Sequence, residues 1–248
     1  MRLNRFLSAS GFASRRKGED VIRSGRIAVN GEVVTDPARS VDPDADTITV
    51  DGVVLVVSEE KRWYVMNKPT GVIVSRGDTH GRVTVFDLLG EETGGVFPVG
   101  RLDADTSGVL LFTDDGETTH RLTHPSYGVE KVYRAEVKGT VEVDDIRRVG
   151  KGLVLDDGPV SPAVIKVLDS SSESSLVEII LHEGRKRQVR RMLGLIGHPV
   201  KTLERLSFGG ITAGSLPLGG YRCLTPGEVA RLGKAVSMTG AEEKHGEK

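Results

Sequence analysis

The sequence predicts an α+β protein in which a small basic N-terminal domain precedes a larger domain with a mixed, largely antiparallel sheet flanked by helices and loops. Short apolar strands alternate irregularly with a few amphipathic helices, which is typical of this class. The 31 glycines among 248 residues indicate many turns. At roughly 150 residues per domain, this length gives one to two domains.

The first domain is expected over residues 1–57. Residues 3–7 carry apolar side chains at helical spacing, and Ser14 is a good N-cap for a second helix that ends at Gly25. Residues 27–29 and 32–34 predict a β-hairpin, because the Asn30-Gly31 pair between them tolerates the positive φ angles of a type I′ turn. A further strand is expected over residues 47–50, and the polar residues 58–62 predict a linker.

The second domain is expected over residues 63–236. We expect its strands at residues 63–66, 72–74, 108–112, 131–137, 163–168 and 176–181. We expect its helices at residues 85–89, at residues 189–196, and from Pro226, where Thr225 and Glu228 match a capping box. Residues 237–248 are polar, and we expect a disordered tail there.

Composition excludes several classes of protein. With 38% hydrophobic and 28% charged residues, the chain is neither fibrous nor fully disordered. The longest apolar run, residues 53–57, is far shorter than the roughly 20 residues that span a bilayer, and residues 1–5 lack the apolar segment of a secretory signal. The single cysteine, Cys223, permits no internal disulfide. We therefore expect a cytoplasmic protein that does not bind membranes.

Charge is distributed unevenly, although the formal net charge is only −1. Residues 1–39 carry eight basic and four acidic side chains, whereas residues 40–60 carry six acidic side chains and no basic one. Residues 183–205 form a second basic segment with seven basic and two acidic side chains. Two separate basic segments suit a polyanion held at two places, although solvated helix faces would give the same pattern.

The helix that starts after Ser14 opens with three cations, Arg15, Arg16 and Lys17. Positive charge at a helix N-terminus costs about 0.3–1 kcal/mol per group, and a bound phosphate backbone would offset that cost. The two helices followed by residues 25–31 (GRIAVNG) resemble the small RNA-binding domain named after ribosomal protein S4. The expected RNA contacts in this domain are Arg2, Arg5, Ser14, Arg15, Arg16, Lys17, Arg26 and Asn30.

An acid-rich loop, residues 100–108, leads into the apolar strand 109–112 and is the best candidate for a reactive site. Asp103 and Asp105 permit several interpretations from the residues alone. They could act as a glycosidase-like acid and base, bind magnesium together with the acidic residues 114–115, or supply one nucleophilic or basic carboxylate held ionised by an arginine. They could equally cap turns.

A family resemblance separates these alternatives. Residues 100–111 (GRLDADTSGVLL) resemble the signature of pseudouridine synthases, in the branch that acts on ribosomal RNA. Further segments match the family in the same order: residues 67–71 (NKPTG), 81–87 (GRVTVFD), 130–133 (EKVY) and 183–192 (EGRKRQVRRM). The segment 81–87 is similar to a loop common among members that act on large-subunit RNA. Together with the N-terminal domain, the resemblance covers residues 1–235.

The resemblance implies roles for individual residues. Asp103 would be the essential aspartate, which either attacks the ribose or removes a neighbouring ribose proton. Tyr133 would stack on the base and accept the proton from carbon five, and Arg190 would pair with Asp103. Arg101 would fill the gap left by the flipped nucleotide, since a stacked base cannot be reached by a side chain. The other expected RNA contacts in this domain are Lys68, Arg185, Lys186, Arg187 and Arg191.

The function implied by the resemblance is isomerisation of a specific uridine in ribosomal RNA to pseudouridine, with no cofactor and no metal. Large-subunit RNA is the favoured target, and small-subunit RNA is the alternative. We expect a monomer whose partner is ribosomal RNA or a ribosomal assembly intermediate. A non-catalytic RNA-binding or assembly protein is the alternative class, and intact Asp103, Tyr133 and Arg190 favour the enzyme.

Overall fold

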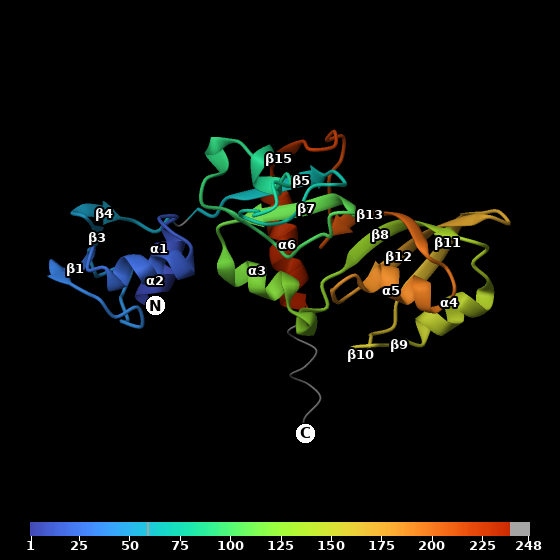
Figure 1. Cartoon of the computed structure of the whole chain (residues 1–248). Helices are drawn as coiled ribbons and strands as arrows, with labels where there is room; N and C mark the ends of the chain where they lie inside the picture. Colours follow the sequence, from blue (N-terminus) through green and yellow to red (C-terminus); the bar gives the residue numbers. More distant parts are fainter. Residues whose placement is uncertain (59, 239–248) are drawn as a thin grey trace, which may run out of the picture. The chain divides into compact units, whose positions relative to one another are not determined.

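The computed structural model describes residues 1–58 and 60–238, which divide into two compact units. The first unit contains residues 1–62, 90–97 and 113–116, and the second contains the remainder (Figure 1). The domain boundary expected near residues 58–62 stays a prediction. The two short later segments of the first unit were not expected from the sequence.

The first unit combines two helices with a four-stranded antiparallel sheet in the order β2-β1-β3-β4. Its elements are α1 (Leu3–Ala9), α2 (Arg15–Arg23), β1 (Ile27–Val29), β2 (Glu32–Val33), β3 (Ile48–Val50) and β4 (Val53–Leu55). Apolar faces of both helices pack on β1 and β3 around Phe6 and Ile22. Asn30 and Gly31 have φ angles of 51° and 86°, which confirms the predicted hairpin turn. Strand β4 was not predicted.

The second unit is built on a nine-stranded mixed sheet whose main path runs β11-β12-β8-β13-β7-β5-β15. Its strands are β5 (Trp63–Lys68), β6 (Phe97–Pro98), β7 (Ser107–Thr113), β8 (Lys131–Lys138), β11 (Val164–Ser170), β12 (Ser174–Leu181), β13 (Val200–Phe208), β14 (Ile211–Thr212) and β15 (Tyr221–Cys223). Strand β8 pairs antiparallel with both β12 and β13, whereas β13 and β7 run parallel. A separate hairpin joins β9 (Val154–Leu155) and β10 (Gly158–Pro159).

Helices cover the sheet in two groups (Figure 1). They are α3 (Gly116–Thr123), α4 (Val143–Gly150), α5 (Gln188–Leu195) and α6 (Pro226–Met238), with 3-10 turns η1 (Val85–Leu88) and η3 (Pro125–Tyr127). A further 3-10 turn, η2 (Glu91–Thr93), belongs to the first unit. Residues of α3 and α6 pack with β5 and β7 in one core, and residues of α4 and α5 pack with β8, β11 and β12 in a second core. Strand β13 contributes to both cores, with Phe208 in the first and Leu203 in the second.

Some expectations for the second unit were wrong. Residues 72–74 do not form a strand, because only Ile73 makes an isolated bridge, to Thr84. The central strand β13 was missed, as were α3 and α4. Helix α6 continues to Met238, so residues 237–238 are helical, and the rest of the expected tail lies outside the described residues. In the described part of the chain, no helix has the length and apolar character needed to cross a membrane.

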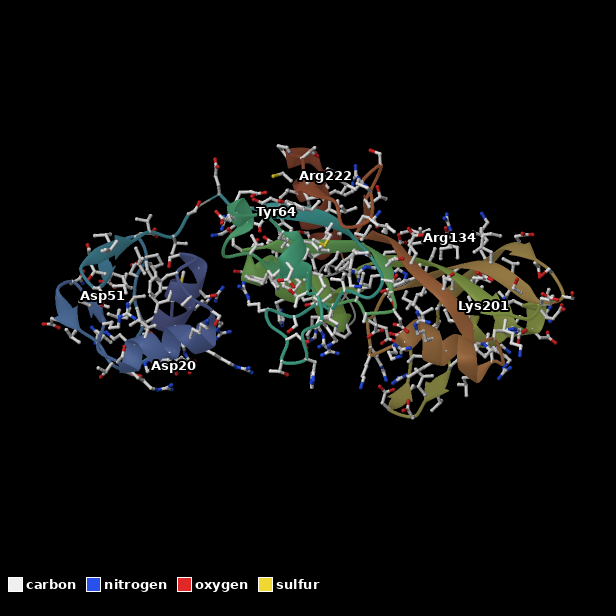
Figure 2. All side chains as sticks on the ribbon, turned by 45° about the horizontal axis from the view of Figure 1, so that its top comes forward. Asp20, Asp51, Tyr64, Arg134, Lys201 and Arg222 are labelled. Atoms are coloured by element: carbon white, nitrogen blue, oxygen red, sulfur yellow. The ribbon has the colours of Figure 1, made fainter. Side chains whose placement is uncertain are left out.

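One edge of the large sheet is fixed by the pairing of β15 with β5, where Cys223 lies opposite Tyr64 and Arg222 opposite Val65. The Tyr64 and Tyr221 rings pack edge to face with centroids 6.3 Å apart. Arg222, labelled beside this edge in Figure 2, donates two hydrogen bonds of 2.8 Å to Glu228 at the start of α6. Glu228 also closes the predicted capping box with Thr225.

Candidate active site

The second unit contains a cavity of about 310 Å³ where the acid-rich loop meets β8, β13 and the start of α5. Asp103 of the loop, Tyr133 and Lys131 of β8, and Arg205 of β13 line it. A concave site of this size that combines apolar walls with a few convergent charged groups is typical of small-ligand and catalytic sites. The cavity is therefore the candidate active site.

Lys68, at the end of β5, holds the acid-rich loop in place. Its ammonium donates hydrogen bonds of 2.9 Å to the carbonyl oxygens of Pro69 and Thr106. The side chain is fully buried, and burial lowers the pKa of Lys68 to about 8 against the opposing effect of Asp103 and Asp105. The expectation that Lys68 contacts RNA is therefore wrong, because its ammonium is inaccessible and engaged by the backbone.

The two aspartates of the loop have different surroundings. Asp105 accepts hydrogen bonds of 3.0 and 2.9 Å from the two terminal nitrogens of Arg187, and Arg190 Nε lies 3.3 Å from its Oδ2. The Arg187 hydrogen bonds hold the pKa of Asp105 below its usual value. Asp103 makes no side-chain hydrogen bond in the described part of the chain, and its nearest cation is Arg187 Nη1 at 3.9 Å.

The predicted pairing of Arg190 with Asp103 is therefore wrong in this structure. Arg190 instead donates a hydrogen bond of 2.7 Å to the Asp105 carbonyl oxygen and pairs with the Asp105 carboxylate. Arg187, which was expected to contact RNA, is the arginine nearest Asp103. Asp105 thus holds both arginines beside the loop, and the carboxylate of Asp103 is left facing the cavity.

Arg187 caps α5 in a backbone conformation that is unusual for a residue with a side chain. Its φ of 51° places it in the left-handed region, where a non-glycine residue costs of order 1–3 kcal/mol. Such strain persists only where surrounding contacts fix the residue, and here the paired hydrogen bonds to Asp105 supply that fixation. Strain of this kind is concentrated at functional sites.

Tyr133 is half-buried on β8 and lines the cavity. Its partner across the antiparallel ladder with β13 is Arg205, and the partner of Lys131 is Phe208. Lys131 and Tyr133 are two residues apart on one strand and therefore share one face of the sheet. These four side chains line the same part of the cavity.

Comparison with known proteins agrees with this geometry. A family model described as RNA pseudouridylate synthase matches residues 62–194, and a model of the S4 domain matches residues 1–46. The chain belongs to the RNA pseudouridylate synthase family. Both expected modules, an N-terminal S4 domain and a synthase domain, are thereby confirmed.

Individual family members extend over nearly the whole chain. An RNA pseudouridine synthase of Aquifex aeolicus is 43% identical over 239 residues, which cover 96% of each chain. Ribosomal large subunit pseudouridine synthase B of Bacillus subtilis is 41% identical over 233 residues, covering 93% of this chain and 95% of that protein. A crystal structure of a pseudouridylate synthase, 31% identical, covers 94% of this chain and 99% of its own with a TM-score of 0.68.

The residues expected to contact RNA in this synthase fall into two groups. Some have side chains that already contact another residue of the protein, and others do not. In the second unit, Arg101 and Lys186 are exposed, line the cavity, and have no side-chain partner within the described ranges. Arg185 and Arg191 instead contact Asp157, with Arg191 Nη1 3.0 Å from its carboxylate. The second basic segment is thus partly neutralised by acidic side chains, which its sequence count did not predict.

In the S4 domain, the cations at the start of α2 are exposed. Arg15, Arg16 and Lys17 have no side-chain partner in the part of the chain that is described, and Arg2 and Arg5 are exposed on α1 or beside it. Three other expected contacts are engaged within the domain. Arg26 pairs with Asp51, Asn30 bonds Asp46 and the Thr47 amide, and the Ser14 hydroxyl accepts from the Lys17 amide at 3.4 Å. The RNA contact expected of each of these three residues stays a prediction.

Sequence reasoning missed two residues of the cavity. Lys131 and Arg205 are only 6% and 3% exposed, although both carry a full charge at the cavity wall. Lys131 belongs to the matched segment 130–133, and Arg205 had been counted only as part of a basic segment. A charged residue within a segment of strand-forming residues was the one available sign of a functional role. That Lys131 and Arg205 lie close together follows only from the pairing of β8 with β13.

Proposed function

We propose that this synthase isomerises a uridine of large-subunit ribosomal RNA to pseudouridine, with Asp103 as the catalytic carboxylate. The observation that carries the proposal is the contrast between the two aspartates. Asp105 is held by two arginines, whereas the Asp103 side chain lines the cavity and makes no hydrogen bond to the described residues. The Bacillus subtilis relative is named for the large ribosomal subunit, which supports the choice of RNA.

The reaction begins with a uridine flipped out of its stack, at a cost of a few kcal/mol that backbone contacts repay. The bond between N1 and C1′ then breaks, and its electron pair leaves with the ring. Asp103 either forms a bond to C1′ or removes the proton from C2′, and the proposal leaves these two routes open. After the ring turns, C5 bonds to C1′. On the first route the bond between Asp103 and C1′ breaks at this step, and on the second route Asp103 returns the proton to C2′. The C5 proton then passes to Tyr133, and N1 gains a proton.

Other residues serve RNA binding in this proposal. Arg101, exposed at the mouth of the cavity, fills the space of the flipped nucleotide. Arg15, Arg16 and Lys17 contact phosphates through the S4 domain, where their charge and the free amides at the start of α2 act on the same anion. We further propose that the protein acts as a cytoplasmic monomer, on ribosomal RNA or on an assembly intermediate.

The test is pseudouridine mapping of ribosomal RNA from cells with the gene intact, deleted or carrying Asp103→Asn. The proposal predicts that the deletion and Asp103→Asn each remove the same one or few large-subunit sites. Asp169→Asn is a matched control, because Asp169 is an exposed carboxylate near the β11–β12 hairpin, and it should preserve the map. An unchanged map in the deletion strain would contradict the proposal and favour the non-catalytic alternative.

A further inference from the structure

The cavity wall contains two buried cations that the proposed steps do not use. Lys131 donates its ammonium to the Val129 carbonyl oxygen at 2.7 Å, and Arg205 donates Nε to the Val109 carbonyl oxygen at the same distance. One terminal nitrogen of the Arg205 guanidinium, Nη2, is also buried, and it has no hydrogen-bond partner in the part of the chain that the structure describes. Burying charge without a partner is costly, so such groups call for a functional explanation.

The two cations are held on one aromatic ring. Lys131 Nζ lies 5.2 Å and Arg205 Cζ 4.9 Å from the centroid of the Phe208 ring, which is itself 1% exposed. The backbone of Arg205 is fixed on both sides, since β13 pairs antiparallel with β8 and parallel with β7. Both charges are therefore placed by the central strands of the sheet and do not depend on a mobile loop.

The nearby protein carboxylates do not neutralise both cations. Glu183, which acts on Lys131 electrostatically, is itself engaged by Gln188 Nε2 at 2.7 Å and by the Ser161 amide at 3.0 Å. Burial, together with Arg205, lowers the pKa of Lys131 to about 8. Because both cations are buried, this excess of positive charge would act strongly on negative charge that develops beside them in the cavity.

We propose that Lys131 and Arg205 stabilise the uracil ring as an anion at the moment it leaves C1′, an inference that rests on the proposed function. The N1–C1′ electron pair enters the ring and spreads over N1 and the two carbonyl oxygens. The ring is neutral before this step and again after C5 has bonded to C1′, lost its proton and N1 has been protonated. The cations therefore favour the transition state over the bound substrate, as catalysis requires.

The test varies the stability of the leaving anion. Large-subunit RNA is transcribed with uridine or with 5-fluorouridine, whose fluorine withdraws electrons and makes the ring anion intrinsically more stable. Formation of the bond between C5 and C1′ is followed by mass spectrometry under single-turnover conditions. Because C5 of 5-fluorouridine carries fluorine where uridine carries the departing proton, its C-linked product keeps the fluorine and takes up water at the N1–C6 double bond instead of losing a proton. Removing one preorganised charge at a reacting centre costs about 100-fold in rate. Lys131→Met should lose about 100-fold on uridine RNA but only about tenfold on 5-fluorouridine RNA.

A second variant protects the test against misfolding. Arg205→Gln should raise the ratio of the 5-fluorouridine rate to the uridine rate in the same direction, and it decides the result if Lys131→Met does not fold. Lys138→Met is the matched control, because Lys138 is an exposed lysine at the far end of the same strand. It should leave both rates unchanged.

Two outcomes would overturn the inference. An equal loss on both RNAs would make Lys131 and Arg205 structural, and a loss of RNA affinity without a change in single-turnover rate would make them phosphate contacts. Failure of the proposed function gives a different result, since the parent protein would then convert uridine in neither large-subunit nor small-subunit RNA. Asp103→Asn must lose activity on both RNAs if the proposed function holds.

Discussion

Arg187 donates hydrogen bonds of 3.0 and 2.9 Å to Asp105 while its Nη1 lies 3.9 Å from Asp103. One guanidinium thus distinguishes two carboxylates that are two residues apart. The carboxylate oxygens of Asp105 accept the hydrogen bonds of Arg187, whereas the carboxylate oxygens of Asp103 stay available to a group in the cavity.

Arg187→Lys should lower kcat/KM about tenfold, because an ammonium cannot make the two parallel hydrogen bonds that fix the guanidinium between the aspartates. The measurement is steady-state pseudouridine formation on ribosomal RNA. Arg222→Lys is the control, since Arg222 makes a comparable two-bond contact with Glu228 at the sheet edge. Equal losses in the two variants would argue against a special role for Arg187.

The buried ammonium of Lys68 should make the stability of the protein depend on pH. Its pKa is lowered from 10.5 to about 8 in the folded protein, so between these values the unfolded chain binds a proton that the folded protein does not. Unfolding free energy therefore rises with pH across this window, by up to about 3 kcal/mol. Below about pH 8 both states bind the proton, and Lys68 contributes no further pH dependence.

Urea unfolding at several pH values between 7 and 10.5 checks this expectation. The difference in unfolding free energy between the parent and Lys68→Met should increase with pH, because methionine cannot titrate. Lys138→Met, which removes an exposed lysine, should follow the parent curve. Parallel curves for the parent and Lys68→Met would show that the buried ammonium is not responsible.

Replacing both Arg15 and Arg16 with Ala should weaken RNA binding and flatten its salt dependence. Each lost phosphate contact lowers the slope of log K against log salt by about 0.7 for single strands and about 0.9 for duplex. Binding titrations at a series of salt concentrations measure the slope. Arg23→Ala on the same helix is the control, because Arg23 already pairs with Glu19 at 3.5 Å. An unchanged slope would remove Arg15 and Arg16 from the interface.

Gly108→Ala should prevent stable folding of the synthase domain. A Cβ at this position would lie 2.2 Å from the Arg205 carbonyl oxygen, and the φ of 100° is unfavourable for a side chain. We expect a loss of more than about 3 kcal/mol, measured by chemical unfolding. Gly194→Ala in α5 meets no atom within 4 Å and should instead stabilise by about 0.5–1 kcal/mol. Wild-type stability of Gly108→Ala would contradict the close pairing of β7 with β13.

Helices and strands could be predicted where one continuous segment contained both the apolar spacing of the element and the residues that end it. Helix α5 follows from apolar residues at 3.6-residue spacing that stop before Gly197, and the hairpin of β1 and β2 follows from Asn30-Gly31. Strand β7 was readable because both of its faces are buried, which makes its sequence continuously apolar. Strand β13 was not, because its residues 200–208 mix charged and apolar side chains although it lies at the centre of the sheet.

The sequence by itself determined the two-module organisation and the family, and it predicted Asp103 as the catalytic residue, because all three depend on contiguous motifs. Only the tertiary structure decided which arginine faces Asp103 and which holds Asp105, since residues 103–105 and 187–190 meet through loop and helix packing. It also decided that Lys131 and Arg205 share a cavity wall. Pairing between strands about 70 residues apart sets that contact, and neither strand encodes the identity of its partner.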